Sequence, residues 1–217
     1  QMNPLNTQTV VECCLAHGFA LAGVTTAKQT IYENEFETWL KQAKQGEMDW
    51  MNRNVEIRKD PRGLLDGANS VICVADRYGE LEEPLVKQGH GRIARYARGK
   101  DYHKEMKRRL REVCDVLKQS SPSDTFRYCV DTAPILEREC ATNAGLGAIG
   151  KHTLLIEQGI GSWLLLGVIV TTANLSPINS TIQDPCTTCT RCIDACPTDA
   201  ITPWSVDARR CISYLTI

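Results

Sequence analysis

Four cysteines in the last fifth of the sequence have the spacing of an iron–sulfur motif. The stretch DPCTTCTRCIDACP places Cys186, Cys189, Cys192 and Cys196 in the pattern C-x2-C-x2-C-x3-C-P. In this pattern the first three thiolates bind one cluster, and the fourth usually binds a different one. Zinc also takes C-x2-C ligands, but normally from two separated pairs. The run therefore predicts electron transfer through iron–sulfur clusters.

The other cysteines divide into one candidate ligand and six core residues. Cys211, in RRCISYLTI, follows Cys196 by fifteen residues and is predicted to bind the second cluster. Its alternative is a core position on the amphipathic stretch DARRCISYL. A chain of this length with no secretory signal is not expected to be a disulfide scaffold. Apolar surroundings favour small buried hydrophobes at the remaining six positions, which are Cys13, Cys14, Cys73, Cys114, Cys129 and Cys140.

Basic residues are concentrated between positions 92 and 111, where the sequence has nine Lys or Arg residues interleaved with Tyr96 and Tyr102. The whole chain has a net charge of −1, so an RNA-binding surface would have to be a local patch. Phosphate contacts and stacking of a tyrosine on an unpaired base would suit such a patch. For residues 104–111 the alternative is a solvated helix face.

The glycine-rich stretch GLGAIGKHTLLI is a weak match to a phosphate-binding motif. Gly145, Gly147 and Gly150 fit G-x-G-x-x-G, but a dinucleotide-binding fold needs this loop directly after a strand. Here it follows a predicted helix. We therefore predict a loop between a helix and a buried strand.

The surrounding pattern predicts the elements that position these residues. Strands are predicted over residues 19–26, 70–78, 126–132 and 162–170, and helices over 7–18, 31–46, 101–119 and from Pro134 onward. Thr7 or Thr9 is the expected cap of the first helix. The polar stretch NLSPINSTIQDP predicts a domain boundary near residue 180. The longest apolar run is about half of what a bilayer requires, so no membrane association is expected.

Several long segments resemble the epoxyqueuosine reductase family, cobalamin-dependent iron–sulfur enzymes of queuosine biosynthesis. The resemblance rests on GEMDWMNRNVEIRKDPRGLLDGANSVICVA, RIARYARGKDYHKEMKRRL, VDTAPILERECATNAGLGAIGKHTLLI, the cysteine run and RRCISYLTI. It implies an α+β chain. Residues 1–180 would form a nitroreductase-like α/β domain that binds cobalamin, and residues 181–217 would begin a ferredoxin-like domain with two 4Fe–4S clusters. The implied reaction is removal of the epoxide oxygen of epoxyqueuosine in the tRNA anticodon loop.

The resemblance also assigns roles to individual residues. Asp131 would be the proton donor, and burial at the end of a short strand would raise its pKa. The alternative is that Asp131 caps the following helix or forms an Asx-turn. Tyr102 and four basic residues would contact RNA: Arg95, Arg98, Lys100 and Lys104. The implied cobalamin contacts are Arg58, Tyr96, Gly150, Lys151, His152, Thr153 and Leu155.

Two positions depart from the family, which usually has tryptophan at Ala148 and asparagine at His152. His152 is not expected to ligate cobalt. We expect a cytoplasmic monomer that receives electrons from an unidentified low-potential donor. The alternatives are a reductive dehalogenase-like enzyme and a non-enzymatic electron carrier or cobalamin-handling protein.

The cysteine count predicts an incomplete ferredoxin domain. Two 4Fe–4S clusters need eight cysteines, whereas this sequence offers five in the cluster region. In the family a second cysteine run supplies the other three. We therefore expect the chain to end inside that domain and its C-terminal segment to be disordered.

Overall fold

The computed structural model describes residues 5–78, 87–178 and 183–216. The centre of this α/β structure is a four-stranded sheet in the order β1-β2-β6-β3, and every neighbouring pair of strands is antiparallel. The strands are β1 (Leu21–Thr26), β2 (Ser70–Arg77), β3 (Phe126–Cys129) and β6 (Leu164–Thr171). All four lie within or at the edges of the predicted strands.

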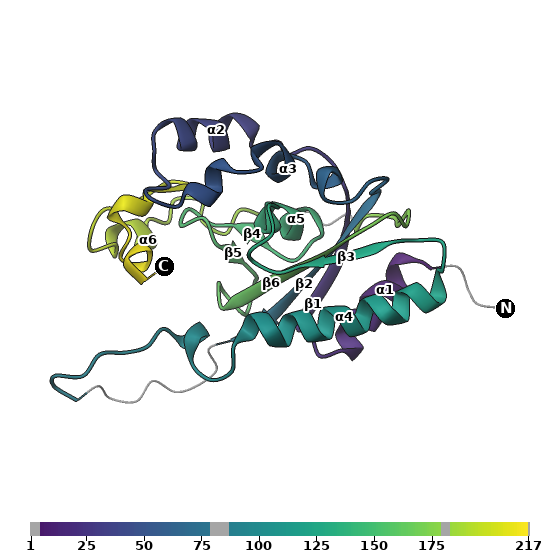
Figure 1. Ribbon diagram of the computed structural model, residues 1–217. Helices are drawn as coiled ribbons and strands as arrows, with labels where there is room; N and C mark the ends of the chain where they lie inside the picture. Colours follow the sequence, from purple (N-terminus) through teal and green to yellow (C-terminus); the bar gives the residue numbers. More distant parts are fainter. Residues whose placement is uncertain (1–4, 79–86, 179–182, 217) are drawn as a thin grey trace.

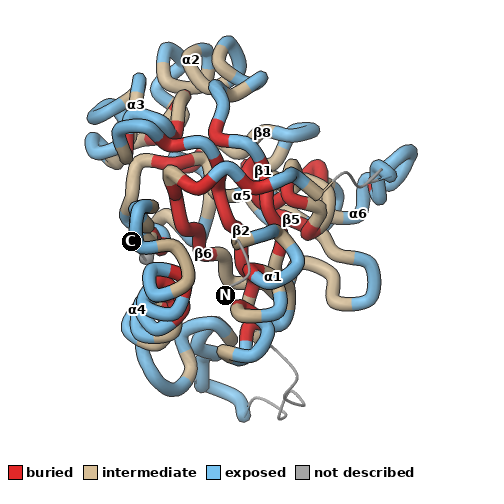
Figure 2. Tube along the Cα trace, turned by 90° about the vertical axis from the view of Figure 1, so that its right-hand side faces the viewer, coloured by how far each residue is buried: buried red, intermediate tan, exposed pale blue. Residues whose placement is uncertain are grey.

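Both faces of the sheet are covered, which explains why its two central strands are almost continuously apolar. On one face, Ile72 and Val74 of β2 pack against α1 (Thr7–Ala16) and α4 (Tyr102–Ser120). On the other face, Val71 and Cys73 pack against α5 (Glu137–Asn143). Figure 1 shows α1 and α4 on the side of the sheet opposite α5, and Figure 2 shows the buried strands between them.

The six cysteines outside the cluster run belong to these cores. Five are buried and Cys13 is partly buried, which confirms the prediction that they act as small hydrophobes. Burial raises the pKa of Cys14 and of Cys114 to about 12, so neither thiol forms a thiolate readily.

Two helix starts differ from the sequence prediction. Asn6, rather than Thr7 or Thr9, caps α1, and its side-chain oxygen accepts the Thr9 N–H at 3.0 Å while Thr9 bonds back to the Asn6 backbone. The helix α5 begins at Glu137 and not near Pro134. Asp131 has a φ of 55°, so the chain makes a turn here before it can enter the helix.

The glycine-rich stretch was predicted to be a loop, and it instead forms a hairpin of β4 (Ala148–Ile149) and β5 (Leu155–Ile156). A Cβ at Gly147 would overlap the carbonyl oxygen of Ile156, and a Cβ at Gly150 would lie 2.5 Å from Ile156 Cδ1. Gly147 is therefore required by its close approach to the Ile156 backbone, whereas the contact at Gly150 is with a side-chain tip that can move.

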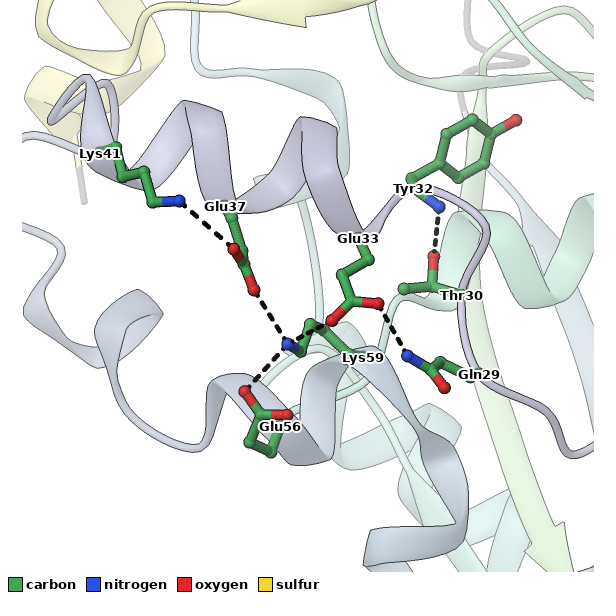
Figure 3. A network of polar contacts seen from close by, with 8 residues as sticks. All are labelled: Gln29, Thr30, Tyr32, Glu33, Glu37, Lys41, Glu56 and Lys59. Carbon is green, nitrogen blue, oxygen red and sulfur yellow. Dashed lines mark hydrogen bonds and ion pairs between the residues drawn. The ribbon is translucent and has the colours of Figure 1, made fainter.

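An ion-pair network joins α2 (Glu33–Lys41) to α3 (Val55–Lys59), as Figure 3 shows. The buried Nζ of Lys59 lies 2.7 Å from Glu33, 3.0 Å from Glu37 and 2.9 Å from Glu56. Three carboxylates thus satisfy all three donors of one ammonium group. The network positions α3, which carries the predicted site residue Arg58.

Residues 183–216 pack beside α2 and the hairpin (Figure 1). The indole N–H of Trp39 donates to the Val206 carbonyl at 2.7 Å, and the Ala208 N–H donates to the Lys44 carbonyl at 2.8 Å. Ala200 and Ala208 are buried. The expectation of a disordered C-terminal segment was therefore wrong, because contacts to the first part of the chain order it. The predicted boundary at residue 180 lies outside the described residues.

The elements described within residues 183–216 are short: α6 (Arg191–Asp194), β7 (Ile201–Thr202), β8 (Ser205–Val206) and the 3-10 turns η4 (Ala208–Arg210) and η5 (Ile212–Thr216). Three further 3-10 turns lie earlier in the chain: η1 (Asp49–Asn52), η2 (Pro61–Leu64) and η3 (Arg95–Ala97). Across the described ranges, no helix combines the length and the apolar character needed to span a bilayer.

Candidate active site

A cavity of about 170 Å³ lies where the central sheet, the hairpin and the starts of α4 and α5 converge. Its wall is apolar on one side, from leucines of the hairpin and β6, and carries ionisable groups on the other. The lining residues are Tyr78, Tyr102, Asp131, Glu137, Arg138, Leu154, Leu155, Ser162, Leu164, Leu165 and Leu166. Asp131 and Leu155, both predicted site residues, thus share one cavity.

Asp131 lies at the mouth of this cavity rather than inside it. Its side chain is 59% exposed, and its Oδ2 lies 3.0 Å from His103 Nε2. The expectation that Asp131 is buried was wrong, because the turn after β3, with Asp131 in a left-handed conformation, leaves the carboxylate exposed. The helix-cap alternative is also not seen, since no side chain caps α5.

His103 connects Asp131 to a second carboxylate. Its Nδ1 lies 3.0 Å from Oδ1 of Asp101, the N-cap residue of α4. Desolvation lowers the pKa of His103, but its hydrogen bonds to Asp131 and Asp101 outweigh this, so the pKa is raised. Sequence reasoning missed His103 because Asp131 is 28 residues away; only the fold brings the two together.

Glu137 is the carboxylic acid lining this cavity whose pKa is raised by burial. Burial raises its pKa to about 7, opposed by the hydrogen bond from the Asp131 backbone N–H and reinforced by the Asp131 carboxylate. That N–H lies 2.9 Å from Glu137 Oε1. The sequence feature that could have indicated Glu137 is its position in the first turn of the helix that follows Asp131.

Aromatic side chains form one rim of the cavity. Tyr78 meets Trp163 edge-on at 5.7 Å between ring centroids, and Tyr96 meets Tyr102 edge-on at 6.3 Å. The guanidinium of Arg95 lies 4.5 Å above the Trp163 ring. Trp163 is 44% exposed, and sequence reasoning did not select it. Its ring and those of the tyrosines offer planar surfaces for stacking.

The hairpin residues predicted to contact cobalamin make mostly internal contacts. The Leu154 N–H donates to His152 Nδ1 at 3.1 Å, and His152 Nε2 lies 3.2 Å from Ser162 Oγ. Both ring nitrogens of His152 therefore have partners within this region of the protein. Arg138 donates to the Thr153 carbonyl at 3.0 Å.

Lys151 faces the cysteine segment and not the cavity. Its buried Nζ donates to the carbonyls of Thr187 and Cys189 at 2.8 and 3.0 Å. Gly150, next to it, stays within the hairpin. Neither position lines the cavity.

Arg58 has an unsatisfied buried donor. Its Nη2 donates to the Trp50 carbonyl at 3.4 Å, while its Nε is buried without a hydrogen-bond partner among the described atoms. Burial lowers the pKa of Arg58, and Glu137 opposes that effect. A buried donor of this kind is available to an anionic or carbonyl group of a bound molecule.

The predicted RNA-contacting residues lie next to the cavity mouth, where residues 87–100 extend away from the sheet (Figure 1). Lys100 and Lys104 are exposed, and Arg98 Nε donates to the Ile93 carbonyl at 2.9 Å. Farther along α4, Arg108 forms ion pairs with Glu105 and Glu112. The exposed lysines are thus concentrated at the start of α4.

Backbone donors surround the cysteine run in a way that suits iron–sulfur clusters. The Lys151 N–H donates to Cys186 Sγ at 3.4 Å, and the Ala200 N–H donates to Cys196 Sγ at 3.3 Å. Backbone N–H donors, first among them that of Thr198, lower the pKa of Cys196. Donors of this kind stabilise a thiolate and adjust the reduction potential of a cluster. The surroundings of these cysteines therefore suit iron–sulfur clusters.

In the described part of the chain, the cysteines do not form a group of three or more His, Cys, Asp or Glu side chains that could hold a metal ion. Cys186 is buried, Cys189 is exposed, and Cys192, Cys196 and Cys211 are intermediate. Their individual assignment as ligands stays a prediction.

Two family models match the chain. The model described as "Epoxyqueuosine reductase QueG, DUF1730" matches residues 58–132, which include Arg58, His103 and Asp131. The model described as "4Fe-4S double cluster binding domain" matches residues 185–217, which include the cysteine run and Cys211.

Curated relatives extend the match over nearly the whole chain. The epoxyqueuosine reductase of Xanthomonas campestris pv. campestris is 43% identical over 206 residues, covering 92% of this chain and 58% of the relative. That of Cyclobacterium marinum is 38% identical, covering 98% of this chain and 69% of the relative. The chain thus spans roughly half to two-thirds of the length of these relatives.

Solved structures agree with this match. The epoxyqueuosine reductase of Streptococcus thermophilus aligns with a TM-score of 0.88 at 26% identity, over 96% of this chain and 57% of that one. An epoxyqueuosine reductase with a tRNA-Tyr epoxyqueuosine-modified stem loop aligns at 0.85 and 29%, over 96% and 56%. A third, from Bacillus subtilis with its catalytic aspartate loop swung out of the active site, aligns at 0.79 and 27%, over 96% and 56%.

Proposed function

The chain belongs to the epoxyqueuosine reductase family, and on that premise we propose that it takes part in reducing epoxyqueuosine to queuosine in the tRNA anticodon loop. Removing the epoxide oxygen as water consumes two electrons and two protons. Cobalamin and the 4Fe–4S clusters, when bound, supply the low-potential electrons. The residues of this chain would hold these groups and the RNA and would deliver a proton.

The observation that carries the proposal is the placement of Asp131. Its carboxylate lies at the mouth of the cavity, 3.0 Å from His103, and the ring of His103 is held by Asp101. A carboxyl group in this position can donate a proton to a departing oxygen and can regain it through the partly exposed His103. The catalytic loop of the Bacillus subtilis enzyme also carries an aspartate, and we assign the corresponding role in this chain to Asp131.

We infer that cobalamin binds against the apolar wall of the cavity, where Leu155 and the β6 leucines lie. Arg58, with its unpartnered buried Nε, and Tyr96 on the aromatic rim would contact the cofactor or the substrate. Gly150, Lys151, His152 and Thr153 would act mainly by shaping the hairpin that borders this wall. Residues 1–180 would thereby form the nitroreductase-like cofactor domain.

The tRNA would approach over the start of α4. Lys100 and Lys104 are exposed there, and Arg95, Arg98 and Tyr102 lie around the same mouth. A solved relative has been determined with an epoxyqueuosine-modified tRNA stem loop, which supports tRNA as the substrate class. Electrons would arrive from a low-potential donor through the cysteine segment, in a cytoplasmic and monomeric protein.

The test is turnover of epoxyqueuosine-containing tRNA by anaerobically prepared enzyme loaded with iron, sulfide and cobalamin. Asp131→Asn removes the proton but keeps the shape of the side chain, so we expect turnover to fall by about 100-fold or more. Asp115→Asn, an exposed change on α4, is the matched control. Unchanged turnover in Asp131→Asn would contradict the assignment, and failure of the protein to bind cobalamin would contradict the proposed chemistry.

A further inference from the structure

The Asp131 turn has two contacts with the helices around it: its side chain meets His103 of α4, and its backbone meets the carboxylate of Glu137 in α5. Asp131 has a φ of 55°, in the left-handed region that L-residues other than Asn and Asp rarely adopt. Its backbone N–H donates to Glu137 Oε1 at 2.9 Å. The neighbouring turn bonds are local, from Thr132 N–H to the Val130 carbonyl and from Ile135 N–H to the Ala133 carbonyl. The contact with Glu137 therefore ties the turn to the first residue of α5.

We propose that Glu137 is a positioning residue for the reaction, whose ionised carboxylate latches the Asp131 turn over the cavity and whose protonation loosens that latch. The inference rests on the proposed function, in which Asp131 is the proton donor. Glu137 lines the same cavity as Asp131, and no part of the proposed proton delivery otherwise uses it.

The strength of the latch depends on the charge of Glu137. A hydrogen bond to an ionised acceptor is about twice as strong as one between neutral groups. Burial raises the pKa of Glu137 to about 7, so both forms are populated near neutrality. Ionisation of Glu137 would thus hold the turn in place.

Charged and titratable groups from every surrounding element act on Glu137. Asp131 of the turn raises its pKa, whereas Arg138 of α5 and His103 of α4 lower it. Arg58 of α3 and Tyr102 of α4 also interact with it electrostatically. The thiols of Cys73, Cys129 and Cys140 face it from β2, β3 and α5; their pKa values are raised, so they stay neutral over the relevant range.

The experiment follows the backbone amide of Asp131 by NMR in nitrogen-15-labelled protein between pH 5 and 8.5. The amide proton shift should move with a midpoint near 7, because its acceptor ionises there. Glu137→Gln keeps an oxygen acceptor but should abolish this titration. Glu137→Ala should increase the amide exchange rate about 10- to 100-fold, as expected for loss of a hydrogen bond to a charged group. In the loaded enzyme, the turnover of Glu137→Gln should lose the part of its pH profile with a midpoint near 7.

Glu157→Gln is the matched control. The Glu157 carboxylate also accepts a backbone N–H within a turn, that of Ile160 at 3.1 Å, and its replacement should leave the Asp131 amide unchanged. A titration of this amide that persists unchanged in Glu137→Gln would overturn the proposal. So would an Asp131 amide whose exchange is unaffected by Glu137→Ala.

The two proposals can fail separately. Asp131→Asn keeps the backbone N–H, so the amide titration should persist in this variant while turnover is lost. If the titration behaves as expected but Asp131→Asn remains active, the latch stands and the proton-donor role falls. If Asp131→Asn is inactive but the Asp131 amide shift and exchange are unchanged by substitution of Glu137, the proton-donor role is supported and the positioning role of Glu137 is refuted.

Discussion

Glu137 and Asp131 are two carboxylates of one cavity that the fold places in different surroundings. Asp131 is exposed and contacts an imidazole, whereas Glu137 is partly buried and accepts a backbone N–H. Burial holds the pKa of Glu137 near 7. The two groups are therefore suited to different tasks. The exposed Asp131 can exchange protons with solvent, whereas Glu137 can respond to changes of pH near neutrality.

The raised pKa of Glu137 predicts a specific pH dependence of stability. Between about pH 4.5 and pH 7 the unfolded chain has released the Glu137 proton while the folded protein still binds it. The free energy of unfolding contributed by this group therefore falls as the pH rises through that window. The Glu137→Gln variant has no ionisable group at this position and does not lose this stability. Its free energy of unfolding minus that of wild type should therefore increase from pH 4.5 to pH 7 by on the order of 2 kcal/mol.

Urea unfolding of both proteins at several pH values from 4.5 to 8 measures this difference. His103, whose pKa is raised by its hydrogen bonds to two carboxylates, is present in both proteins, so its contribution largely cancels. A difference between the two proteins that stays constant with pH would show that the folded state does not shift the pKa of Glu137.

At the scale of elements, the site depends on how closely α5 approaches the sheet. Gly23 of β1 lies beneath the end of this helix, where a Cβ would overlap the Ala144 carbonyl oxygen and lie 2.7 Å from Leu146 Cδ1. The missing side chain lets α5 and the following hairpin sit directly on β1. This close approach in turn sets the position of Glu137 at the other end of the helix.

Gly23→Ala should therefore destabilise the protein by about 1–3 kcal/mol, because the backbone of α5 must move to admit one methyl group. The measurement is the unfolding midpoint in urea. Gly91→Ala is the control, since nothing lies within 4 Å of a Cβ at that position. Equal midpoints for the two variants would mean that α5 shifts without cost.

At the scale of the whole molecule, Lys151 joins the sheet domain to the cysteine segment. Its Nζ donates to the Thr187 and Cys189 carbonyls, its N–H to Cys186 Sγ, and its carbonyl accepts the Trp204 N–H at 2.9 Å. The hairpin that borders the cavity thus contacts the segment that would hold the clusters. This arrangement would place the proposed cluster site and the proposed site of reduction on opposite sides of one short loop.

Lys151→Met preserves the length of the side chain but leaves two carbonyls of the cysteine loop without their donor. We expect residues 183–216 to be cleaved about tenfold faster in limited proteolysis, since losing two hydrogen bonds to a charged group costs more than about 1.4 kcal/mol. Iron incorporation during reconstitution should fall as well. Lys41→Met, at a lysine whose side chain is 77% exposed, should change neither. Unaltered proteolysis and iron content in Lys151→Met would show that the loop is held by other contacts.

The sequence by itself located the strands of the central sheet and indicated iron–sulfur chemistry. Periodicity located all four strands of the central sheet, because a buried strand must be apolar wherever it is covered. The cysteine spacing indicated the clusters, since ligands to one cluster come from a short stretch of chain. The core role of the six scattered cysteines followed from their apolar neighbours.

Only the tertiary structure decided which residues share the site and which carboxylate is desolvated. Asp131 and His103 are 28 residues apart, and their contact depends on how β3 and α4 meet. The burial of a group is set by packing, so the sequence could suggest burial of Asp131, whereas the fold exposes Asp131 and partly buries Glu137. The order of residues 183–216 is likewise a tertiary outcome, because the contacts that hold this segment come from α2 and the hairpin, more than 30 residues away in the chain.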